Sequence, residues 1–354
     1  MIRLLDKIVF LFSVITLCGL LGAYTARYVN PDIFVIPSLL GLAYPYLLVA
    51  NILLLFYWTA RWKKMSIVTL LVLCAGIPFF TSYYGTHRSD AASVSSDISV
   101  LSYNVRFFDK FGWSKNKQTY NKLLDYLNRF KGDFSCLQEF PANNTSLPPQ
   151  QIIKGLSTYP YHSLHKDMAI FSRLPILHTG RITFDKSHTG SAQYCDVLKG
   201  KDTLRIYNIH LESYRLGHKE RKFVKEITTG ATQDFSKGVK NILSRIVRAN
   251  KARARQALLI REHIAQSPHK VILCGDFNDT PLSYTYNTIC SQLMDCFLQK
   301  GHGLGNTYIG EFPSFRIDYI FHSPDFITTD YTRHSINLSD HYPISCKLKI
   351  RPYF

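Results

Sequence analysis

Residues 272–279 read ILCGDFND, an apolar run that stops at a glycine and then presents two acids and an amide. A short apolar run bounded by glycine is typical of a buried β-strand. The polar residues Asp276, Asn278 and Asp279 then stand where the strand leaves its sheet. Since functional residues are disproportionately carried where a rigid scaffold gives way to a loop, we expect this concentration of carboxylate and amide groups to serve a site.

Other apolar runs of the chain end in the same way, with a carboxylate, an amide or an imidazole. If these strands lie side by side, one edge of the sheets collects the polar groups in a single cleft. Taken singly, each position has a plainer interpretation, because strand ends commonly meet water. Asp318 beside Arg316, for example, would be a surface ion pair of little energetic value. The positions are Asn104, Glu139, Asn208, His210, Asp318, Asp340 and His341.

The region from residue 98 onward alternates β-rich runs with helical patterns. Apolar spacing predicts a helix over 117–130 and one or two more between His218 and Ala265. Strands that first alternate with helices and then follow one another favour a layered α/β or α+β domain over an all-β domain. The expected strands are 98–105, 134–140, 168–172, 192–198, 204–211, 270–277, 316–321 and 342–350.

Short motifs follow one another along this region in the order CLQE, AIFSR, NIHLES, GDFN, RIDYIF and SDH. Together they resemble the endonuclease/exonuclease/phosphatase superfamily, whose fold is shared by pancreatic-type deoxyribonuclease, exonuclease III-like repair nucleases, inositol polyphosphate 5-phosphatases and neutral sphingomyelinases. The resemblance covers about residues 98–350. It implies an α/β (α+β) four-layer sandwich in which two mixed β-sheets lie face to face, flanked by helices.

The resemblance also implies a role for each polar position. The metal-binding residues implied are Glu139 and Asp340, with Asn104 supporting the metal and the phosphate. His341 is similar to the histidine that faces the scissile phosphate, and Asp318 to the acid that holds it. The implied catalytic residues are His210, Asp276, Asn278, Asp318 and His341, and the implied substrate-binding residues are Asn104, Asn208, His210 and Asn278.

Phosphoester hydrolysis requires an aligned water and positive charge near the equatorial oxygens of the phosphoryl group. Carboxylate oxygens such as those of Glu139 and Asp340 suit Mg²⁺ or Mn²⁺, whereas the lack of a Cys/His cluster with metal-ligand spacing disfavours zinc. A carboxylate behind His341 would favour its protonated form and fix its tautomer. We therefore expect an Mg²⁺-dependent phosphoesterase, with Mn²⁺ as a substitute ion.

One departure from the superfamily concerns the residues that follow Asn104. Repair nucleases of this kind usually place a second acid there, whereas this chain has Val105 and Arg106. The departure puts abasic-site repair in doubt, and the further motifs of a 5-phosphatase are not found. Nucleic acid and a lipid or inositol phosphate headgroup, as in a sphingomyelinase, stay open as substrates. The alternative from another class is a non-catalytic, membrane-tethered module that binds an anion.

The first quarter of the chain differs in composition from the rest. Three segments without a charged residue, about 8–26, 33–60 and 65–86, are each long enough to cross a bilayer. They predict a membrane anchor over residues 1–86 with three transmembrane helices, then a serine-rich linker over 87–97 and a catalytic domain over 98–354. A secretory signal is the alternative for the first segment, and buried helices of a soluble domain are the alternative for all three.

The charges between these segments predict the orientation of the anchor. Arg61, Lys63 and Lys64 lie between the second and third segments, whereas Arg27 and Asp32 cancel between the first and second. The positive loop should stay in the cytoplasm. We therefore expect a multi-pass protein of the cell membrane whose catalytic domain lies on the extracytoplasmic side.

The chain carries a formal net charge of +17, which favours anionic partners such as phosphodiesters, nucleic acid or acidic lipid headgroups. Residues 216–261 are especially rich in lysine and arginine. Such a helix either binds an anionic surface or is simply solvated. No protein partner is indicated by the sequence.

The eight cysteines show no CxxC or other metal-ligand spacing. Most lie in apolar runs, where packing is their expected role. Cys290 and Cys296 are near neighbours in the chain, so a bridge between them in an oxidising compartment stays open, but no disulfide framework is expected.

Overall fold

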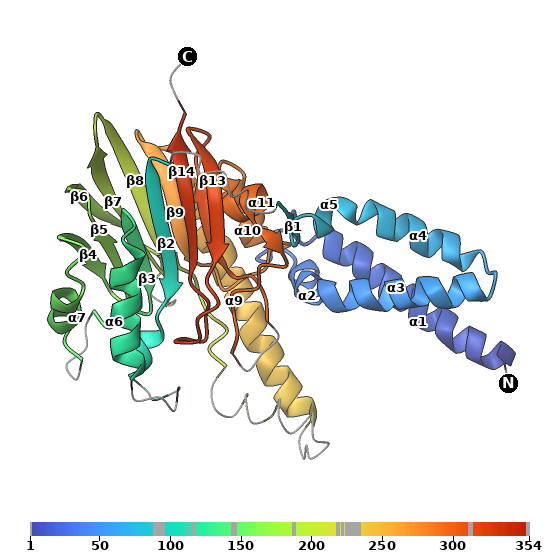
Figure 1. The fold of residues 1–354 in the computed structure, drawn as a ribbon. Helices are drawn as coiled ribbons and strands as arrows, with labels where there is room; N and C mark the ends of the chain where they lie inside the picture. Colours follow the sequence, from blue (N-terminus) through green and yellow to red (C-terminus); the bar gives the residue numbers. More distant parts are fainter. Residues whose placement is uncertain are drawn as a thin grey trace. The chain divides into compact units, whose positions relative to one another are not determined.

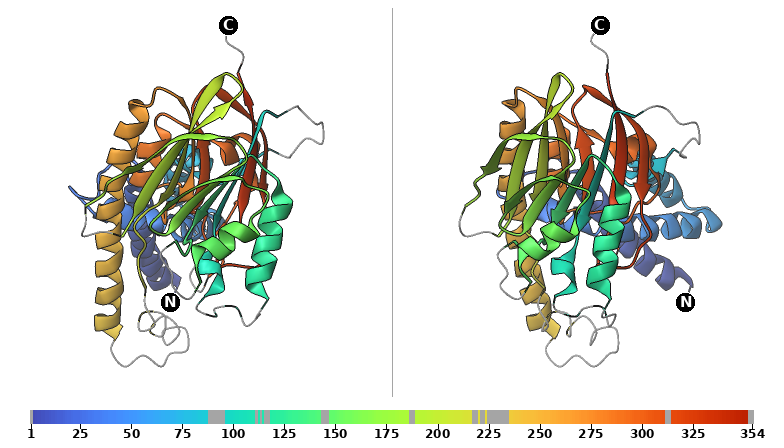
Figure 2. Two further views of the ribbon diagram at one scale, coloured as in Figure 1. Left: turned by 90° about the vertical axis from the view of Figure 1, so that its left-hand side faces the viewer. Right: turned by 60° about the vertical axis from the view of Figure 1, so that its left-hand side comes forward.

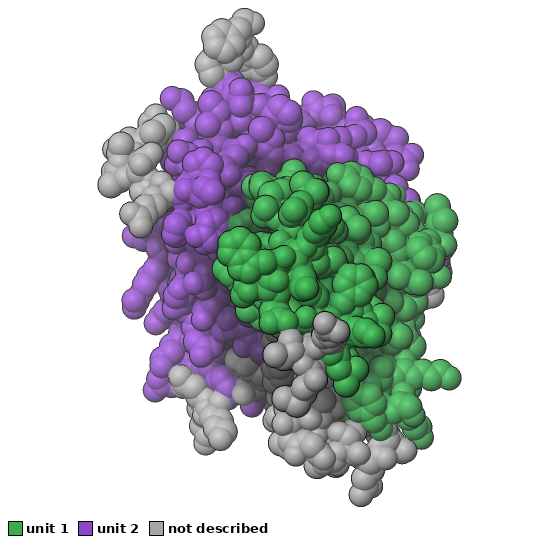
Figure 3. All heavy atoms as spheres, turned by 90° about the vertical axis from the view of Figure 1, so that its right-hand side faces the viewer, with its two compact units in different colours: residues 1–83, 216–254, 280–288 green, residues 84–215, 255–279, 289–354 purple. Residues whose placement is uncertain are grey.

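The computed structural model describes residues 2–87, 96–110, 112, 114, 118–142, 147–185, 189–216, 220, 223, 235–310 and 314–351. The chain divides into two compact units, which Figure 3 shows in different colours. The first unit comprises residues 1–83, 216–254 and 280–288, and the second comprises residues 84–215, 255–279 and 289–354.

Two six-stranded mixed β-sheets form the second unit (Figure 1). The first sheet has the strand order β10(Met294–Asp295)-β12(Asp318–His322)-β9(Lys270–Asp276)-β8(Asp202–His210)-β7(Ser191–Lys199)-β6(Ile176–Ile182). The second has the order β13(Phe326–Arg333)-β14(Ile344–Ile350)-β2(Ile98–Asn104)-β3(Phe134–Gln138)-β5(Met168–Ser172)-β4(Tyr161–His165). A separate two-stranded ribbon pairs β1(Gly85–Thr86) with β11(His302–Gly303).

An apolar core fills the space between the two sheets. Its buried side chains come from both sheets and include Val100, Ile170, Ile206, Ile272 and Leu348. Side chains alternate between the faces of a strand, so the same strands present a second apolar face to the helices outside. Each sheet is thus buried on both faces, which explains why these runs read as nearly continuous apolar stretches in the sequence.

Helices cover the outer faces of the sheets, and Figure 2 shows them on opposite sides. The helices α6(Thr119–Phe130) and α7(Pro149–Gly155) pack on the second sheet through a cluster that contains Leu123, Leu127 and Ile152. The C-terminal part of α9(Phe235–Ala265) lies over the first sheet, where the Tyr207 hydroxyl and His263 Nδ1 are 2.8 Å apart. The expected four-layer sandwich is therefore confirmed.

All of the expected strands are present, with ends that differ by one or two residues. The sequence patterns missed β4, β6 and β13, three edge strands of the sheets. Edge strands carry a weaker signal, because one or both of their faces meet water. In β6, for example, Leu177 is 58% exposed. The short helix α11(Cys296–Lys300) was also missed, although Asp295 caps it by accepting a hydrogen bond from Phe297 N.

The first unit contains five helices from the N-terminal segment: α1(Ile2–Tyr24), α2(Ile36–Leu42), α3(Tyr44–Ala60), α4(Met65–Ala75) and α5(Ile77–Phe80). It also contains the first part of α9 and most of α10(Tyr284–Cys290). Of the described helices, Leu4–Tyr24 alone is long and apolar enough to cross a membrane without interruption. The pair α2 and α3 meets the same criteria only as one span bent by 69°.

The helices differ from the three continuous spans that the sequence suggested, and proline explains the breaks. Pro37, Pro45 and Pro78 each stand in the first turn of a new helix, where the missing N–H is no loss. The segment 65–86 is therefore not one helix: α4 has 11 residues, α5 follows Gly76, and residues 85–86 belong to β1. A helix of 11 residues rises only about 16 Å.

The basic segment 216–261 is only partly described. Lys219, Arg221, Lys222 and Lys225 lie outside the described residues, as does most of the predicted linker 87–97. Within α9, Lys237, Lys240, Arg248, Arg255 and Arg261 are exposed. Arg253 is instead fully buried and donates a hydrogen bond of 2.5 Å to Asn250 Oδ1. The described charges of this segment are thus partly solvated and partly structural.

The cysteines are free thiols in this structure. Five of them are buried, in accord with the expected packing role. The Cys290 thiol donates to Leu293 O at 3.5 Å, and the Cys296 thiol contacts that of Cys346. The bridge considered between Cys290 and Cys296 is therefore absent, because the two side chains turn to different neighbours.

Candidate active site

The strand directions bring the polar ends to one edge of the sandwich. The pairs β2–β3 and β8–β9 are parallel, so their carboxyl ends lie together. His210 and Asp276 are paired in register at the ends of β8 and β9. Asp318 begins β12, which runs antiparallel to β9, and pairs with Asp276 from the other side. Residues far apart in the sequence are in this way placed on adjacent strands.

Gly275 explains why glycine precedes Asp276. Its φ is +157°, and a Cβ built on it would lie 2.1 Å from the backbone oxygen of Ile209 in the neighbouring strand. No other residue fits without moving that backbone. The close approach of β8 and β9 at this point places His210 beside Asp276.

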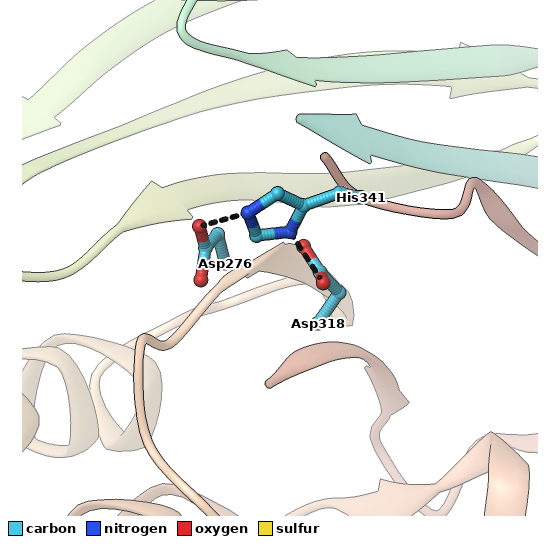
Figure 4. A group of neighbouring side chains, drawn as sticks. All are labelled: Asp276, Asp318 and His341. Atoms are coloured by element: carbon cyan, nitrogen blue, oxygen red, sulfur yellow. Dashed lines mark hydrogen bonds and ion pairs between the residues drawn. The ribbon is translucent and has the colours of Figure 1, made fainter. Parts of the chain in front are cut away.

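Asp276, Asp318 and His341 form a tight buried group, drawn in Figure 4. His341 Nδ1 lies 2.8 Å from Asp318 Oδ2, and the opposite ring nitrogen, Nε2, lies 3.8 Å from Asp276 Oδ2. Burial opposes the charged ring, but the charges of Asp318 and Asp276 and the hydrogen bond to Asp318 raise the pKa of His341 to about 10. The imidazole is thus protonated near neutral pH, as expected from an acid behind it.

A second imidazole–carboxylate pair faces the first. His210 Nδ1 lies 2.9 Å from Asp167 Oδ2, and His210 Nε2 lies 3.9 Å from Asp276 Oδ2. Burial disfavours its charge, but the hydrogen bond to Asp167 and the nearby carboxylates raise the pKa of His210 to about 9. Two imidazolium Nε2 atoms therefore approach the same oxygen of Asp276.

Asp167 is a site residue that the sequence patterns missed. It directly precedes β5, which runs antiparallel to β3, so it stands at the same edge as the carboxyl end of β3. The sequence pattern of a polar group after an apolar run does not include Asp167, which comes before such a run. Acids that precede antiparallel strands form a second pattern, to which Asp318 also belongs.

Asp276 itself is buried and lies between the two imidazoles. Burial and the charge of Asp318 raise its pKa, although the two histidines and the amide of Asn278 act in the opposite direction. A carboxylate with a raised pKa beside two protonated rings is suited to accept a proton from water. Asp276 is therefore the candidate general base of the site.

Asn104 links the acids of the two sheets. Its Nδ2 donates to Asp276 Oδ2 at 3.0 Å and to Glu139 Oε1 at 3.3 Å, so one amide holds carboxylates from β9 and from the residue after β3. Ser339 Oγ donates to Asn104 O at 2.8 Å. The segment before Asp340 and His341 is thus tied to the end of β2.

Glu139 and Asp340 fit a divalent cation. Burial raises the pKa of Glu139, the charge of His210 lowers it, and the charge of Asp340 raises it. A cation held by these residues would stabilise the ionised form of Glu139 and offset the repulsion from Asp340. By contrast, His341 in the group of Figure 4 is protonated and bonded to Asp318, so its Nδ1 does not suit a metal.

Asn278 follows the end of β9 and has a φ of +51° that asparagine tolerates better than most residues. Its backbone N donates to Asp276 Oδ1 at 2.8 Å, and its Nδ2 donates to Leu211 O at 3.1 Å. The first bond ties Asn278 to the end of β9, and the second joins the loop after β9 to the loop after β8. Asn278 is partly exposed, as a substrate contact must be.

Asn208 does not face the site. It is fully buried, and its Nδ2 donates to Leu137 O at 2.9 Å and to Ala169 O at 3.0 Å in the opposite sheet. Its Oδ1 accepts a bond of 2.7 Å from Gln138 Nε2. The substrate-binding role predicted for Asn208 is therefore wrong in this geometry: the residue joins the two sheets beneath the site.

The turn after Asn104 is strained. Arg106, Phe107, Phe108 and Asp109 all have positive φ values, of 44°, 52°, 55° and 58°. For non-glycine residues each such conformation costs about 1–2 kcal/mol, and it persists where surrounding contacts fix it, often at functional sites. Here Phe107 N donates to Glu139 O at 2.7 Å, and Phe108 is buried against Phe140.

The sequence profile described as "Endonuclease/Exonuclease/phosphatase family" matches residues 101–341, about two thirds of the chain. The chain belongs to this family. It is accordingly a metal-dependent phosphoesterase, as the resemblance implied. A second profile, of a domain of unknown function (DUF8431), matches residues 6–83. No curated protein sequence matches the chain.

Solved structures show the same fold at low sequence identity. A family protein from Bacteroides vulgatus is 16% identical with a TM-score of 0.53, over 73% of this chain and 100% of that one. The mannosyl-6-phosphatase of Bacteroides thetaiotaomicron is 17% identical with a TM-score of 0.51, over 71% and 99%. D. rerio TDP2 complexed with a single-strand DNA product is 18% identical with a TM-score of 0.51, over 71% and 98%.

Proposed function

We propose that the protein is a membrane-anchored, Mg²⁺-dependent hydrolase of an anionic phosphodiester. The observation that carries the proposal is the approach of two imidazole–carboxylate pairs to one oxygen of Asp276. A scaffold that only binds anions has no need of a buried acid between two protonated rings, because burying that acid costs free energy unless it is paired.

The side chains divide the chemistry between them. Asp276 accepts a proton from the attacking water and holds it in line, since its raised pKa makes it a competent base. His210 and His341, held protonated by Asp167 and Asp318, donate hydrogen bonds to the phosphoryl oxygens as negative charge grows there. Asn278 orients a further oxygen of the substrate phosphoryl group.

Glu139 and Asp340 would hold the cation, with Asn104 fixing the position of the Glu139 carboxylate. When bound, Mg²⁺ or Mn²⁺ supplies positive charge to the phosphoryl oxygens and lowers the pKa of a coordinated water. Both ions prefer oxygen ligands, which is the donor set of this part of the site.

Hydrolysis of a generic phosphodiester by the full chain in detergent tests the proposal. We expect turnover with Mg²⁺ and none with a chelator, and a loss of at least about a hundredfold in Asp276→Asn and His341→Ala, the scale for removing a transition-state contact. His162→Ala, on the exposed strand β4, and Asp330→Asn, on β13, serve as controls. Turnover without metal, or unaffected by both substitutions, would overturn the proposal.

The substrate is proposed to be a nucleic acid, with a lipid or inositol phosphate headgroup as the second candidate. The net charge of +17 suits a polyanion. Among proteins of similar fold, one is solved with a single-strand DNA product and another is a mannosyl-6-phosphatase, so diesters and monoesters both belong in the test. Rates on DNA, RNA, sphingomyelin, inositol phosphates and mannose 6-phosphate decide between them.

Membrane anchoring is proposed from the distribution of polar groups in the first unit. On α1, α3 and α4 the apolar residues Ile8, Leu53 and Leu71 are 61%, 64% and 64% exposed. Polar residues instead lie inside, where Trp58 Nε1 donates to Ser13 Oγ at 2.9 Å and Asn51 Nδ2 donates to Thr16 O at 3.2 Å. Helices with apolar exteriors and polar interior contacts are typical of membrane proteins.

The orientation follows the positive-inside rule and is proposed to place the catalytic domain outside the cytoplasm. The loop with Arg61, Lys63 and Lys64 would then be cytoplasmic. A C-terminal reporter that matures only outside the cytoplasm should be active. Activity from a cytoplasmic reporter alone would reverse the orientation.

A further inference from the structure

We propose that Arg106 supplies a fixed positive charge on the Asp340 side of the site, so that the protein binds one divalent cation there and not two. The inference rests on the proposed function, because it concerns the cation of the same site. Arg106 comes two residues after Asn104, beyond the end of β2, and its guanidinium contacts Asp340.

The guanidinium is in direct contact with the predicted metal ligand. Arg106 Nη1 lies 3.0 Å from Asp340 Oδ2, with the two side chains 18% and 17% exposed. The other carboxylate oxygen, Asp340 Oδ1, lies 3.3 Å from Ser339 Oγ, whose proton makes the shorter bond of 2.8 Å to Asn104 O. Oδ2 of Asp340 is therefore paired with Arg106, whereas Oδ1 keeps lone pairs that a cation can use.

The backbone of Arg106 is fixed by the other residues of the cation site. Arg106 N donates to Asn104 Oδ1 at 3.1 Å, and the next amide, Phe107 N, donates to Glu139 O at 2.7 Å. The left-handed turn over 106–109 is closed by the buried ring of Phe108. The backbone of Arg106 is thus held by Asn104 directly and by Glu139 through the amide of Phe107.

Charge decides how many cations this arrangement accepts. Glu139 and Asp340 would hold one cation, since Asp340 Oδ1 is not paired with the guanidinium. A second cation at Oδ2 would have to displace Arg106 or lie beside it, where like charges repel strongly in a partly buried site. Arg106 therefore acts as a positioning residue: it orients Asp340 and takes the place of a second ion.

Binding of Mn²⁺ alone to the full chain in detergent, followed by the EPR signal of the free ion, measures the number of sites without any turnover. We expect one tight site in the wild type and in Arg106→Lys, which keeps the charge. We expect a second, weaker site in Arg106→Gln, which removes the charge but keeps a planar polar group. Arg173→Gln is the matched control, because Arg173 donates to Lys131 O at the surface of the same unit.

Two tight sites in the wild type would overturn the inference, whether or not any variant folds. A single site in a folded Arg106→Gln, with an affinity for Mn²⁺ within about twofold of the wild type, would also overturn it. Thermal unfolding of each variant in the same detergent establishes that the binding data come from folded protein. The proposed function fails separately, if the wild type shows no metal-dependent hydrolysis, whereas this inference fails on the number of bound ions in an active wild type.

Discussion

His341 Nε2 lies 3.8 Å from Asp276 Oδ2, while the Nδ1 atom of the same ring is bonded to Asp318 at 2.8 Å. The ring thus joins the acid that begins β12 to the acid that ends β9. Because Asp318 and Asp276 together raise the pKa of His341 to about 10, the ring keeps its proton throughout the neutral range. In the proposed mechanism, the protonated form of this ring is therefore the one that donates to the phosphoryl oxygens.

Asp318→Asn tests this assignment through the pH dependence of activity. The substitution removes a negative charge, so the pKa of His341 should fall from about 10 toward its usual value near 6.5. Since the protonated ring is the active form, kcat/KM should begin to decline at a lower pH than in the wild type. Asp330→Asn should leave the alkaline side of the profile in place. If the alkaline side of the kcat/KM profile were unchanged in Asp318→Asn, the proposed role of the His341–Asp318 pair would be contradicted.

A parallel prediction for the His210–Asp167 pair concerns Asp167→Asn. The pKa of His210 is about 9 with Asp167 ionised and should decrease without that charge and its hydrogen bond. A pKa that is raised in the folded state stabilises the fold fully below about pH 6.5, and this contribution decreases as the pH rises and is lost above about 9. The thermal stability of the wild type should therefore decrease between about pH 6.5 and about 9.

In Asp167→Asn the part of this pH dependence that belongs to His210 should disappear, and kcat/KM should decline at a lower pH than in the wild type. Unfolding curves measured at several pH values, beside pH profiles of activity, check both outcomes. If both the pH dependence of stability and the pH profile of kcat/KM are unchanged in Asp167→Asn, then His210 is not coupled to Asp167 and the His210–Asp167 pair has no role.

The site shows how far strand-end patterns reach. They located Asn104, Glu139, His210, Asp276, Asp318, Asp340 and His341 correctly at one edge of the sandwich. They erred at Asn208, which is on the same face of β8 as His210 but one pleat earlier, where the opposite sheet covers it. Depth below the edge depends on how the sheets are stacked, and a single strand carries no information about that.

The ion pair of Arg316 could not be predicted from the sequence either. Beside Asp318 in the sequence, Arg316 suggested a surface pair, but Arg316 Nη1 lies 2.6 Å from Asp295 Oδ2, and both side chains are 1% exposed. Alternation along the expected strand 316–321 would send Arg316 and Asp318 to the same side, whereas β12 begins only at Asp318. The actual partner of Arg316, Asp295, belongs to β10, a two-residue strand that no sequence pattern indicated.

Arg316→Leu should therefore destabilise the protein strongly. It leaves Asp295 as a buried carboxylate without its cation and removes the stacking of the guanidinium on Phe297, 4.3 Å from the ring centre. Breaking a buried pair in this way costs about 3–5 kcal/mol. The double variant with Asp295→Leu should recover part of the loss, as judged by thermal unfolding. A single variant as stable as the wild type would show that the pair contributes nothing.

Asn208→Ala distinguishes a structural role from substrate binding. It removes the Asn208 hydrogen bonds to Leu137 O, Ala169 O and Gln138 Nε2 from the core, although Gln138 Nε2 keeps Ser102 Oγ and Cys136 O as acceptors. An unsatisfied buried group costs about 1–3 kcal/mol, so a clear decrease in thermal stability is expected, with KM of the folded enzyme unchanged. Asn121→Ala, on the exposed face of α6, is the control. A raised KM at normal stability would restore the substrate-binding role.

Leu53→Lys tests whether the first unit lies in a membrane. Leu53 is 64% exposed in the middle of α3, so a lysine there would be harmless in water. Near the centre of a bilayer the same lysine costs about 2.5–3.5 kcal/mol, which corresponds to roughly a hundredfold in the insertion equilibrium. Leu177→Lys, at a 58% exposed position of β6 in the other unit, is the matched control. We expect membrane fractions to lose the Leu53→Lys protein and keep Leu177→Lys; equal recovery of both would place α3 in water.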